Sequence, residues 1–241
     1  MISFDLIEKL ARKHQTKLDN IIREYIQHLF LFFLYGQKEA DCLYFKGGTA
    51  LKIIYQSPRF SEDLDFSFKN SLNKRKIEAL FINTLNNISE ENIGVDLEEA
   101  KFTSGGYLGI ISYRLFDFKN RISFEISFRK KEKLEKEVTT IVSDYISPYL
   151  IIQLSPAQIV GEKILAALER GKPRDYYDLY FILRNQNLRR YIRKVNLRKI
   201  KDRLNEEKIN FKKELEVLLP FSHHLILKRF KDNLLKEIET F

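Results

Sequence analysis

Polar and apolar residues alternate strictly in one short stretch in the first third of the chain. Residues 63–68 are Asp-Leu-Asp-Phe-Ser-Phe, a pattern that predicts a half-buried strand. Successive side chains of a strand point to opposite faces, so Asp63, Asp65 and Ser67 should share one face while the apolar residues face a core. The pattern therefore predicts two neighbouring carboxylates on one face of a sheet.

Apolar residues at helical spacing predict helices over about 3–14, 18–36 and 73–89. The second of these is apolar around so much of its circumference that we expect it to be largely buried against a sheet.

Three extended segments follow, at about 93–102, 107–116 and 121–128, separated by loops at 103–106 and 117–120 whose residues are typical of turns. An antiparallel meander is expected. The last segment repeats the alternation of residues 63–68, with Glu125 on its polar face. If the two strands are neighbours, Glu125 completes a three-carboxylate site; a solvated acidic residue is an equally good interpretation.

From Ser155 onward the sequence is helical in pattern, and Ser155 and Pro156 have the residue types that begin a helix. We therefore place a domain boundary near residue 155, with a first domain over 1–154 and a second over 155–241. Two further helices are expected at about 208–219 and 222–239.

A glycine pair stands between an apolar extended run and a helical segment. Residues 43–45 lead into Gly47 and Gly48, and a helix is expected to start near Thr49. Glycine lets the backbone approach a ligand, and the N–H groups of a helix start attract anionic oxygens. The order predicts a phosphate-binding geometry, in which the Thr49 hydroxyl could cap the helix, contact a phosphate, or do both.

The paired carboxylates of Asp63 and Asp65 repel each other. Such a pair is stable when it is well solvated or when a cation neutralises it, and Mg²⁺ commonly binds one or two carboxylates together with substrate phosphates. A phosphate cradle followed directly by these carboxylates indicates nucleotide chemistry.

Composition narrows the possible partners. The 241 residues carry 42 Lys and Arg against 33 Asp and Glu, a net charge of +9 with a pI near 9.4, which favours polyanionic partners. A lysine-rich solvated surface explains the same charge.

The single cysteine excludes a disulfide framework. No signal-peptide pattern or run long enough to span a membrane is present, so the expectation is a cytoplasmic protein without a membrane partner.

Basic residues cluster between 184 and 203, with nine Lys or Arg against one acidic residue. A helical face that binds RNA phosphates and a solvated helix both fit this pattern. The candidate RNA-binding residues are Arg189, Arg190, Arg193 and Lys194.

Two carboxylates lie just upstream of this basic stretch, and each has a structural explanation beside a functional one. Asp175 could be a helix N-cap, and Asp178 could lie in the first turn, where the helix dipole favours an acidic residue.

Four pieces of sequence occur in order: GGTAL, RFSEDLDF, a strand carboxylate, and EKILAALERGKPRDYYDL. Together, over about residues 43–183, they resemble the AbiEii/AbiGii toxin nucleotidyltransferases of the polymerase-β-like superfamily. The resemblance implies an α/β (α+β) fold, with a mixed sheet flanked by helices and a C-terminal helical domain that closes the active-site cleft. It also implies a Mg²⁺-dependent enzyme that transfers a nucleotide from a nucleoside triphosphate to a tRNA 3′ end, and a separately encoded antitoxin.

Roles for individual residues follow from the same resemblance. The implied triphosphate and nucleotide contacts are Gly47, Gly48, Thr49, Arg59, Ser61, Lys163 and Asp175; the implied metal ligands are Asp63, Asp65 and Glu125; and Asp178 and Lys163 join these carboxylates in the catalytic set. The family most often has Asp at the third position, so Glu125 departs from its pattern.

Two other functions fit the sequence. The acceptor could be a small molecule or a protein, or the chain could be a non-catalytic nucleotide-sensing or RNA-binding module with the same fold. The three retained acidic residues favour an enzyme, since a module without catalysis has no need of them.

Overall fold

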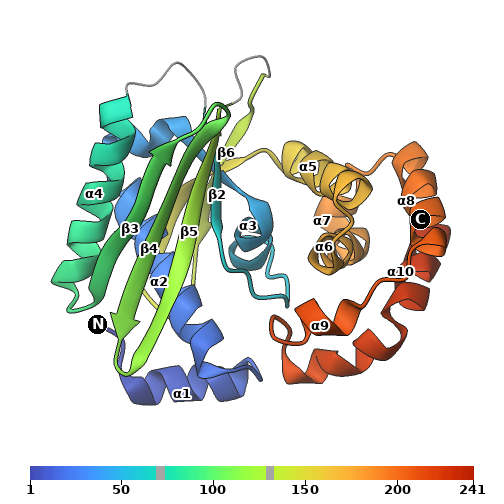
Figure 1. The fold of residues 1–241 in the computed structure, drawn as a ribbon, viewed down its shortest axis with the longest axis horizontal. Helices are drawn as coiled ribbons and strands as arrows, with labels where there is room; N and C mark the ends of the chain where they lie inside the picture. The colour runs from blue at the N-terminus through green and yellow to red at the C-terminus, as the bar shows by residue number, and fades with distance from the viewer. Residues whose placement is uncertain (69–73, 129–132) are drawn as a thin grey trace. The chain divides into compact units, whose positions relative to one another are not determined.

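A mixed sheet is the centre of the N-terminal part of the chain (Figure 1). The computed structural model describes residues 1–68, 74–128 and 133–241, and within them the strand order is β3-β4-β5-β2-β1-β7-β6. The strands are β1 (Leu43–Lys46), β2 (Leu64–Phe68), β3 (Gly94–Phe102), β4 (Gly106–Leu115), β5 (Phe118–Phe128), β6 (Lys136–Ile141) and β7 (Tyr149–Leu154). β2 is antiparallel to β1 and parallel to β5, so the two strands with candidate carboxylates are direct neighbours.

Two long helices of the N-terminal part of the chain cover one face of this sheet. The helical elements here are α1 (Phe4–Lys13), α2 (Leu18–Tyr35), the 3-10 turn η1 (Lys38–Cys42), α3 (Gly47–Ile53) and α4 (Lys74–Glu90). α2 packs on α4, and aromatic rings join both helices to the sheet. The ring centroid of Phe81 on α4 lies 4.2 Å, and that of Phe30 on α2 lies 5.4 Å, from the ring centroid of Phe124 on β5. Phe124 and Glu125 are consecutive strand residues, so the candidate carboxylate faces away from this core.

Two compact units make up the chain. The N-terminal unit comprises residues 1–55 and 61–154, and the C-terminal unit comprises residues 56–60 and 155–241. The short segment 56–60 is joined to its unit by a hydrogen bond from the Phe60 N–H to the Leu218 carbonyl oxygen, 2.7 Å. The C-terminal unit is therefore discontinuous in sequence.

Helices make up the described structure of the C-terminal unit. They are α5 (Pro156–Glu169), α6 (Pro173–Arg184), α7 (Gln186–Arg189), α8 (Lys194–Glu206), α9 (Phe211–Leu215), the 3-10 segment η2 (Phe221–Arg229) and α10 (Phe230–Glu239). Tyr177 of α6 stacks on Phe230 of α10, and Phe211 of α9 packs on the same ring. In the parts of the chain that the structure describes, no helix is long and apolar enough to cross a membrane.

The predicted fold class is confirmed, as are the buried second helix and the antiparallel meander of β3, β4 and β5. Three local predictions are wrong. The turn between β4 and β5 is shorter than 117–120, because β5 already begins at Phe118. The helix predicted at 222–239 begins as 3-10 structure in which no residue is buried. The helix predicted at 208–219 is reduced to α9. Residue 73, the predicted start of α4, lies outside the described residues.

Candidate functional site

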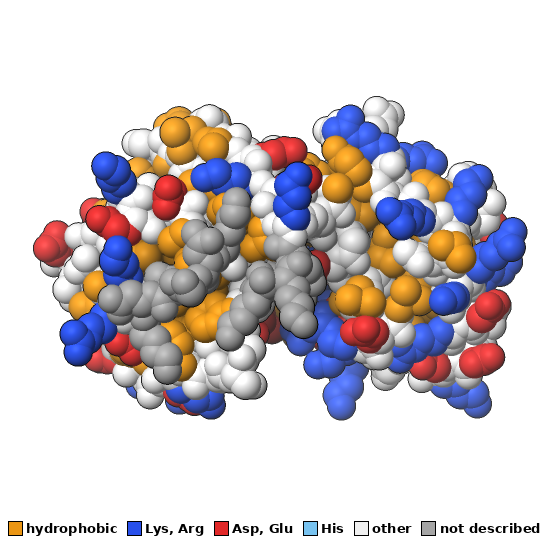
Figure 2. Space-filling view, turned by 90° about the horizontal axis from the view of Figure 1, so that it is seen from above, with side chains coloured by type: hydrophobic (Ala, Val, Ile, Leu, Met, Phe, Trp, Pro, Cys, Tyr) orange, Lys and Arg blue, Asp and Glu red, His pale blue; other side chains and the backbone are white. Residues whose placement is uncertain are grey.

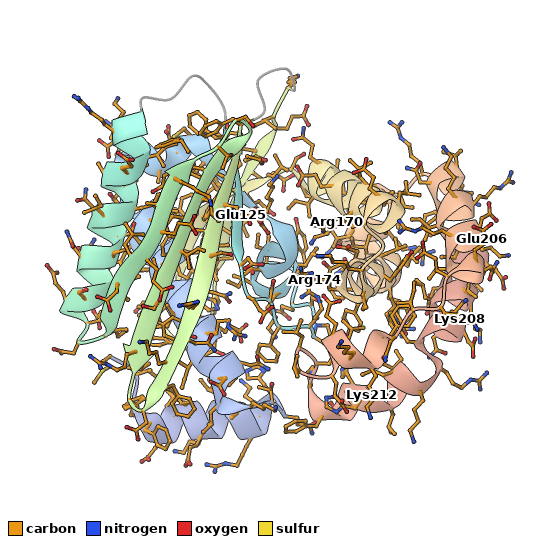
Figure 3. The ribbon with its side chains drawn as sticks, viewed as in Figure 1. Glu125, Arg170, Arg174, Glu206, Lys208 and Lys212 are labelled. Carbon is orange, nitrogen blue, oxygen red and sulfur yellow. The ribbon has the colours of Figure 1, made fainter. Side chains whose placement is uncertain are left out.

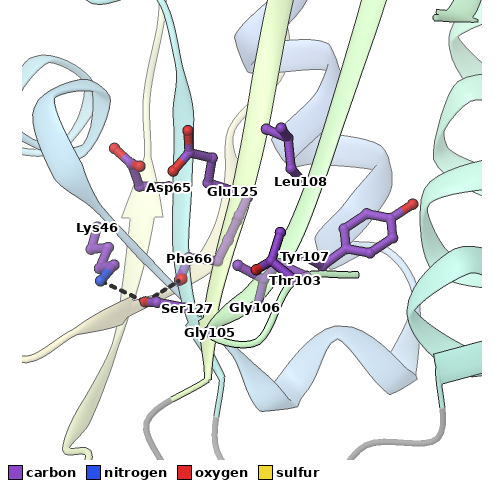
Figure 4. A pocket seen from close by; sticks show the side chains of 11 residues that line it. Lys46, Asp65, Phe66, Thr103, Gly105, Gly106, Tyr107, Leu108, Glu125 and Ser127 are labelled. Atoms are coloured by element: carbon purple, nitrogen blue, oxygen red, sulfur yellow. Dashed lines mark hydrogen bonds between the residues drawn. The ribbon is translucent and has the colours of Figure 1, made fainter. Parts of the chain in front are cut away.

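Asp65 and Glu125 are cross-strand neighbours. The parallel register of β2 and β5 pairs their Cα positions, and Figure 4 shows both carboxylates on the same face of the sheet. Asp63 precedes the first residue of β2. The structure thus places Asp65 and Glu125 on two adjacent strands, with Asp63 at the position just before β2.

Asp63 is anchored through both its backbone and its side chain. The Thr49 hydroxyl donates to the Asp63 carbonyl oxygen, and the Ser123 hydroxyl donates to Asp63 Oδ1 at 2.5 Å. Thr49 is fully buried, and α3 begins two residues earlier than predicted, so Thr49 is not the helix cap. Its hydroxyl instead fixes the chain that carries Asp63; a phosphate contact by Thr49 stays a prediction.

Gly47 lies against Asp65. It has a φ of +83°, in the region that favours glycine, and a Cβ atom at this position would lie 2.0 Å from Asp65 Oδ2. Any other residue here would both strain the backbone and displace the carboxylate. The glycine therefore serves the position of Asp65, in addition to the predicted approach of a phosphate.

The donor set suits a hard cation. Carboxylate oxygens are the ligands that Mg²⁺ prefers, and this ion usually keeps several waters and binds only one or two carboxylates beside substrate phosphates. Asp65 and Glu125 meet that requirement as a pair. Among the described residues, however, no three His, Cys, Asp or Glu side chains already form a group that could hold a metal. The residues fit a site completed by substrate oxygens rather than a preformed three-carboxylate cage.

A second cluster lies within the C-terminal unit. Asp178, on α6, is 1% exposed. Its carboxylate accepts hydrogen bonds from Arg59 Nε at 2.8 Å and Arg59 Nη2 at 3.1 Å, and it forms an ion pair with Lys163 Nζ at 2.8 Å. Burial alone would raise the pKa of Asp178, but the two cations outweigh it and hold that pKa below its usual value. Arg59 Nη1 also donates to the Phe60 carbonyl oxygen, so this guanidinium fixes the segment 56–60.

Structural bonds account for several other predicted residues. Asp175 is the third residue of α6, where its carboxylate accepts the Lys172 N–H at 3.2 Å and pairs with Arg170 at 2.6 Å. Its cap interpretation is thus close to the observed capping box. Asp178 lies beyond the first turn, because α6 begins at Pro173, and the dipole explanation offered for it is wrong. The Ser61 carbonyl oxygen accepts a hydrogen bond from Gln27.

The basic stretch is not one continuous helical face. Arg189, Arg190, Arg193 and Lys194 are exposed around the break between α7 and α8. Other cations of the stretch pair with acids, as Arg184 does with Glu237 at 2.6 Å. In the space-filling view, lysine and arginine side chains are scattered over the C-terminal unit with acidic side chains between them (Figure 2).

Lys46 and Ser123 belong to the site but were not among the predicted residues. β1 and β5 flank β2, so Asp65 has Glu125 as its neighbour on one side and Lys46 of β1 on the other. The Lys46 amino group donates a hydrogen bond to Ser127 Oγ at 2.9 Å. Ser123 could have been predicted from the sequence, because it lies two residues before Glu125 and therefore on the same face of the strand. The place of Lys46 depends on the pairing of β1 with β2, which the sequence does not specify.

The arrangement can bind a hard cation through Asp65 and Glu125 and can accept a proton at a carboxylate.

Figure 3 labels Glu125 on β5 in the N-terminal unit, and Arg170 and Arg174 at the connection between α5 and α6 in the C-terminal unit. Both clusters come from the sequence pieces that carry the family resemblance.

Known structures share this fold. Protein JHP933 from Helicobacter pylori is 19% identical, with a TM-score of 0.58 over 93% of this chain and 95% of its own. MenT4, a nucleotidyltransferase toxin from Mycobacterium tuberculosis, is 16% identical, with a TM-score of 0.65 over 99% of this chain and 89% of its own. A search of curated proteins found no significant match. Residues 31–240 match the sequence model of one family, and the chain therefore belongs to the AbiEii nucleotidyl transferase toxins of type IV toxin–antitoxin systems.

Proposed function

We propose that this toxin transfers a nucleoside monophosphate from a nucleoside triphosphate to the 3′ hydroxyl of a tRNA. The observation that carries the proposal is the pairing of Asp65 with Glu125 next to an anchored Asp63. In the reaction, the acceptor oxygen forms a bond to the α-phosphorus, the bond from that phosphorus to the pyrophosphate oxygen breaks, and the hydroxyl proton passes to a base.

The residues of the N-terminal unit divide this work. Asp65 and Glu125, with Asp63 as the predicted third ligand, would hold Mg²⁺ together with substrate oxygens, and this ion would supply charge stabilisation for the attacking and leaving oxygens. Glu125 is exposed on the open face of β5 and can accept the hydroxyl proton. Gly47 and Gly48, at the start of α3, are the predicted contacts of the triphosphate. Ser123 and Thr49 keep Asp63 in place.

The role of the second cluster stays a prediction. Lys163 and Asp178 are expected from the family resemblance to serve the nucleotide or the reaction. Arg59 enters the proposal as the residue that holds Asp178, because three of its nitrogen atoms already bond within the C-terminal unit.

The choice of RNA rests on charge. A net charge of +9 and the exposed cations Arg189, Arg190, Arg193 and Lys194 favour a polyanionic acceptor over a small neutral molecule. A toxin of this class also works with an antitoxin, which we expect to be a separate protein.

The test is incorporation of labelled nucleotides into total tRNA, with each of the four triphosphates offered in turn. We expect Asp63→Asn and Asp65→Asn to lower incorporation by about 100-fold or more, because charge stabilisation at the reacting phosphate is lost. Asp96→Asn is the matched control, since Asp96 is an exposed carboxylate on β3 of the same sheet, and this variant should keep full activity.

Unchanged incorporation in folded Asp63→Asn would refute the proposed chemistry. Incorporation into a small molecule or a protein but not into tRNA would keep the chemistry and replace the acceptor. Binding of triphosphate without Mg²⁺ and without any transfer would instead favour a nucleotide-sensing module.

A further inference from the structure

A pocket of about 310 Å³ opens beside the paired carboxylates, wholly within the N-terminal unit (Figure 4). Its polar lining includes Asp65, Glu125, Lys46 and Ser127, and Gly105 of the β3–β4 turn also lines it. The volume is at the low end of the range for small-molecule sites and suits a group about as large as one nucleotide.

Strand register shows on which side of the carboxylates this pocket lies. Lys46, Asp65 and Glu125 form one row across β1, β2 and β5, and the next row contains Ser127 and Gly106. The chain leaves Lys46 directly into α3, whereas the row of Ser127 lies in the opposite direction along the strands. The pocket and the start of α3 therefore lie on opposite sides of the carboxylate row.

The pocket contains a buried cation. Lys46 is only 7% exposed, its Nζ donates to Ser127 Oγ at 2.9 Å, and Ser127 Oγ donates to the Phe66 carbonyl oxygen at 3.2 Å. An ammonium group has three donors, so it can contact a ligand oxygen while it keeps the bond to Ser127. A lysine held in this way beside two carboxylates is suited to a phosphate that must lie close to them, since its charge offsets their repulsion.

We propose that this pocket receives the 3′-terminal nucleotide of the acceptor strand and that Lys46 binds its 5′ phosphate. The inference rests on the proposed nucleotidyl transfer. It places the acceptor hydroxyl at Asp65 and Glu125, with the triphosphate on the side of α3. Lys46 is then an acceptor-binding residue rather than a contact of the donor triphosphate.

Two consecutive glycines, Gly105 in the β3–β4 turn and Gly106 at the start of β4, supply a steric test. Gly105 lines the pocket, and a Cβ atom at this position would meet nothing within 4 Å, so a larger residue there clashes with no neighbouring atom and is expected to take up space at the pocket. At Gly106 a Cβ atom would lie 1.9 Å from the Ile126 carbonyl oxygen, so that position must stay glycine. Gly105→Leu is thus a variant that changes the pocket without removing a charge.

The first measurement is binding of a short fluorescent RNA, made in the Asp63→Asn background so that no transfer occurs. Lys46→Met should weaken binding by about tenfold, the loss expected for one hydrogen bond to a charged group, and Gly105→Leu should weaken it in the same direction. The controls are Lys76→Met, an exposed lysine on α4, and Gly161→Leu, an open position on α5. Both should bind RNA as the parent does.

The second measurement is steady-state transfer by Lys46→Met and Gly105→Leu with Asp63 intact. We expect the KM for the RNA to rise while the KM for the triphosphate stays unchanged. A rise in the triphosphate KM alone would assign the phosphate at Lys46 to the donor and overturn the inference. Unchanged RNA binding in folded Gly105→Leu and Lys46→Met would also overturn it.

The two proposals fail separately. If the parent protein transfers nucleotides but its pocket variants bind RNA normally, only the pocket inference is lost. If no transfer occurs but Lys46→Met loses RNA binding, the pocket remains an RNA site and the proposed reaction is lost.

Discussion

Asp63 and Asp178 are carboxylates with very different surroundings. Asp63 is half-buried and accepts one serine hydroxyl, whereas Asp178 is buried between Arg59 and Lys163. A substitution at Asp63 should therefore act mainly on activity. A substitution at Asp178 must also act on stability, because it leaves two cations buried without their counter-charge.

We expect Asp178→Asn to lower the free energy of unfolding by about 3–5 kcal/mol, the usual cost of removing one partner from a buried ion pair. Urea denaturation followed by circular dichroism measures this loss. Because the folded-state pKa of Asp178 is lowered, its contribution is present above the pKa of the unfolded chain and is lost as the pH falls through the folded-state value.

Glu237→Gln is the matched control for this prediction. Glu237 pairs with Arg184, whose side chain is 55% exposed, and such pairs contribute less than about 1 kcal/mol. Equal effects of the two variants would contradict the assigned role of the buried cluster. In a double-mutant cycle, Arg59→Met should couple strongly to Asp178→Asn.

The two-residue repeat of side-chain direction along a strand explains which site residues could be predicted. Alternation places Asp65 and Glu125 on the polar faces of their strands, because side-chain direction in a strand depends only on sequence position. The partners of Thr49 and Arg59 depend instead on residues 14 and 119 positions away, which only the folded chain brings together. For this reason phosphate contacts of Thr49 and Arg59 could be proposed from the sequence, but the hydrogen bonds that these two side chains make in the structure could not.

At the scale of elements, α2 carries a titratable group into the core. His28 is 4% exposed and its Nδ1 lies 2.8 Å from the Tyr149 hydroxyl of β7. Burial lowers the pKa of His28 to about 3, with a smaller lowering by Lys52. The histidine is therefore neutral in the folded protein at any pH near neutrality.

This histidine makes stability depend on pH. Between pH 6.5 and 3 the unfolded chain binds a proton at His28 that the folded protein does not, so the free energy of unfolding falls as the pH falls. The loss from this group between pH 7.5 and 5 should be about 2 kcal/mol. We expect His28→Asn, which can keep a hydrogen bond to Tyr149, to show a correspondingly smaller loss in urea titrations at the two pH values. The same pH dependence in both proteins would contradict the prediction.

Periodicity located the long amphipathic helices well and the short ones poorly. The predicted helix at 18–36 corresponds to α2, Leu18–Tyr35, because eighteen residues of buried pattern leave little ambiguity. Near the C-terminus, the 3-10 segment Phe221–Arg229 buries none of its residues, so no apolar face marks its geometry in the sequence.

At the scale of the whole molecule, the charge of +9 predicts salt-sensitive binding to RNA. Reversal of Arg189, Arg190 and Arg193 to Glu should weaken tRNA binding by more than about tenfold. It should also reduce the slope of log affinity against log salt by about one for each RNA phosphate that the variant no longer neutralises. Filter binding over a series of salt concentrations measures both quantities.

Reversal of Lys9, Arg12 and Lys13 on α1 changes the net charge by the same amount at another exposed place and is the control. If both triple variants lose affinity equally, total charge decides binding and the cations between α7 and α8 have no special role.

The discontinuous C-terminal unit limits how this protein can be divided. A cut after residue 154 leaves segment 56–60, and with it Arg59, on the N-terminal fragment, although that segment belongs to the other unit. The released fragment 155–241 would keep the pair of Lys163 and Asp178 but lose the Arg59 guanidinium that also bonds to Asp178. Neither fragment is then a complete folding unit. An independently folding C-terminal unit would require a rearranged gene that supplies residues 56–60 through a linker.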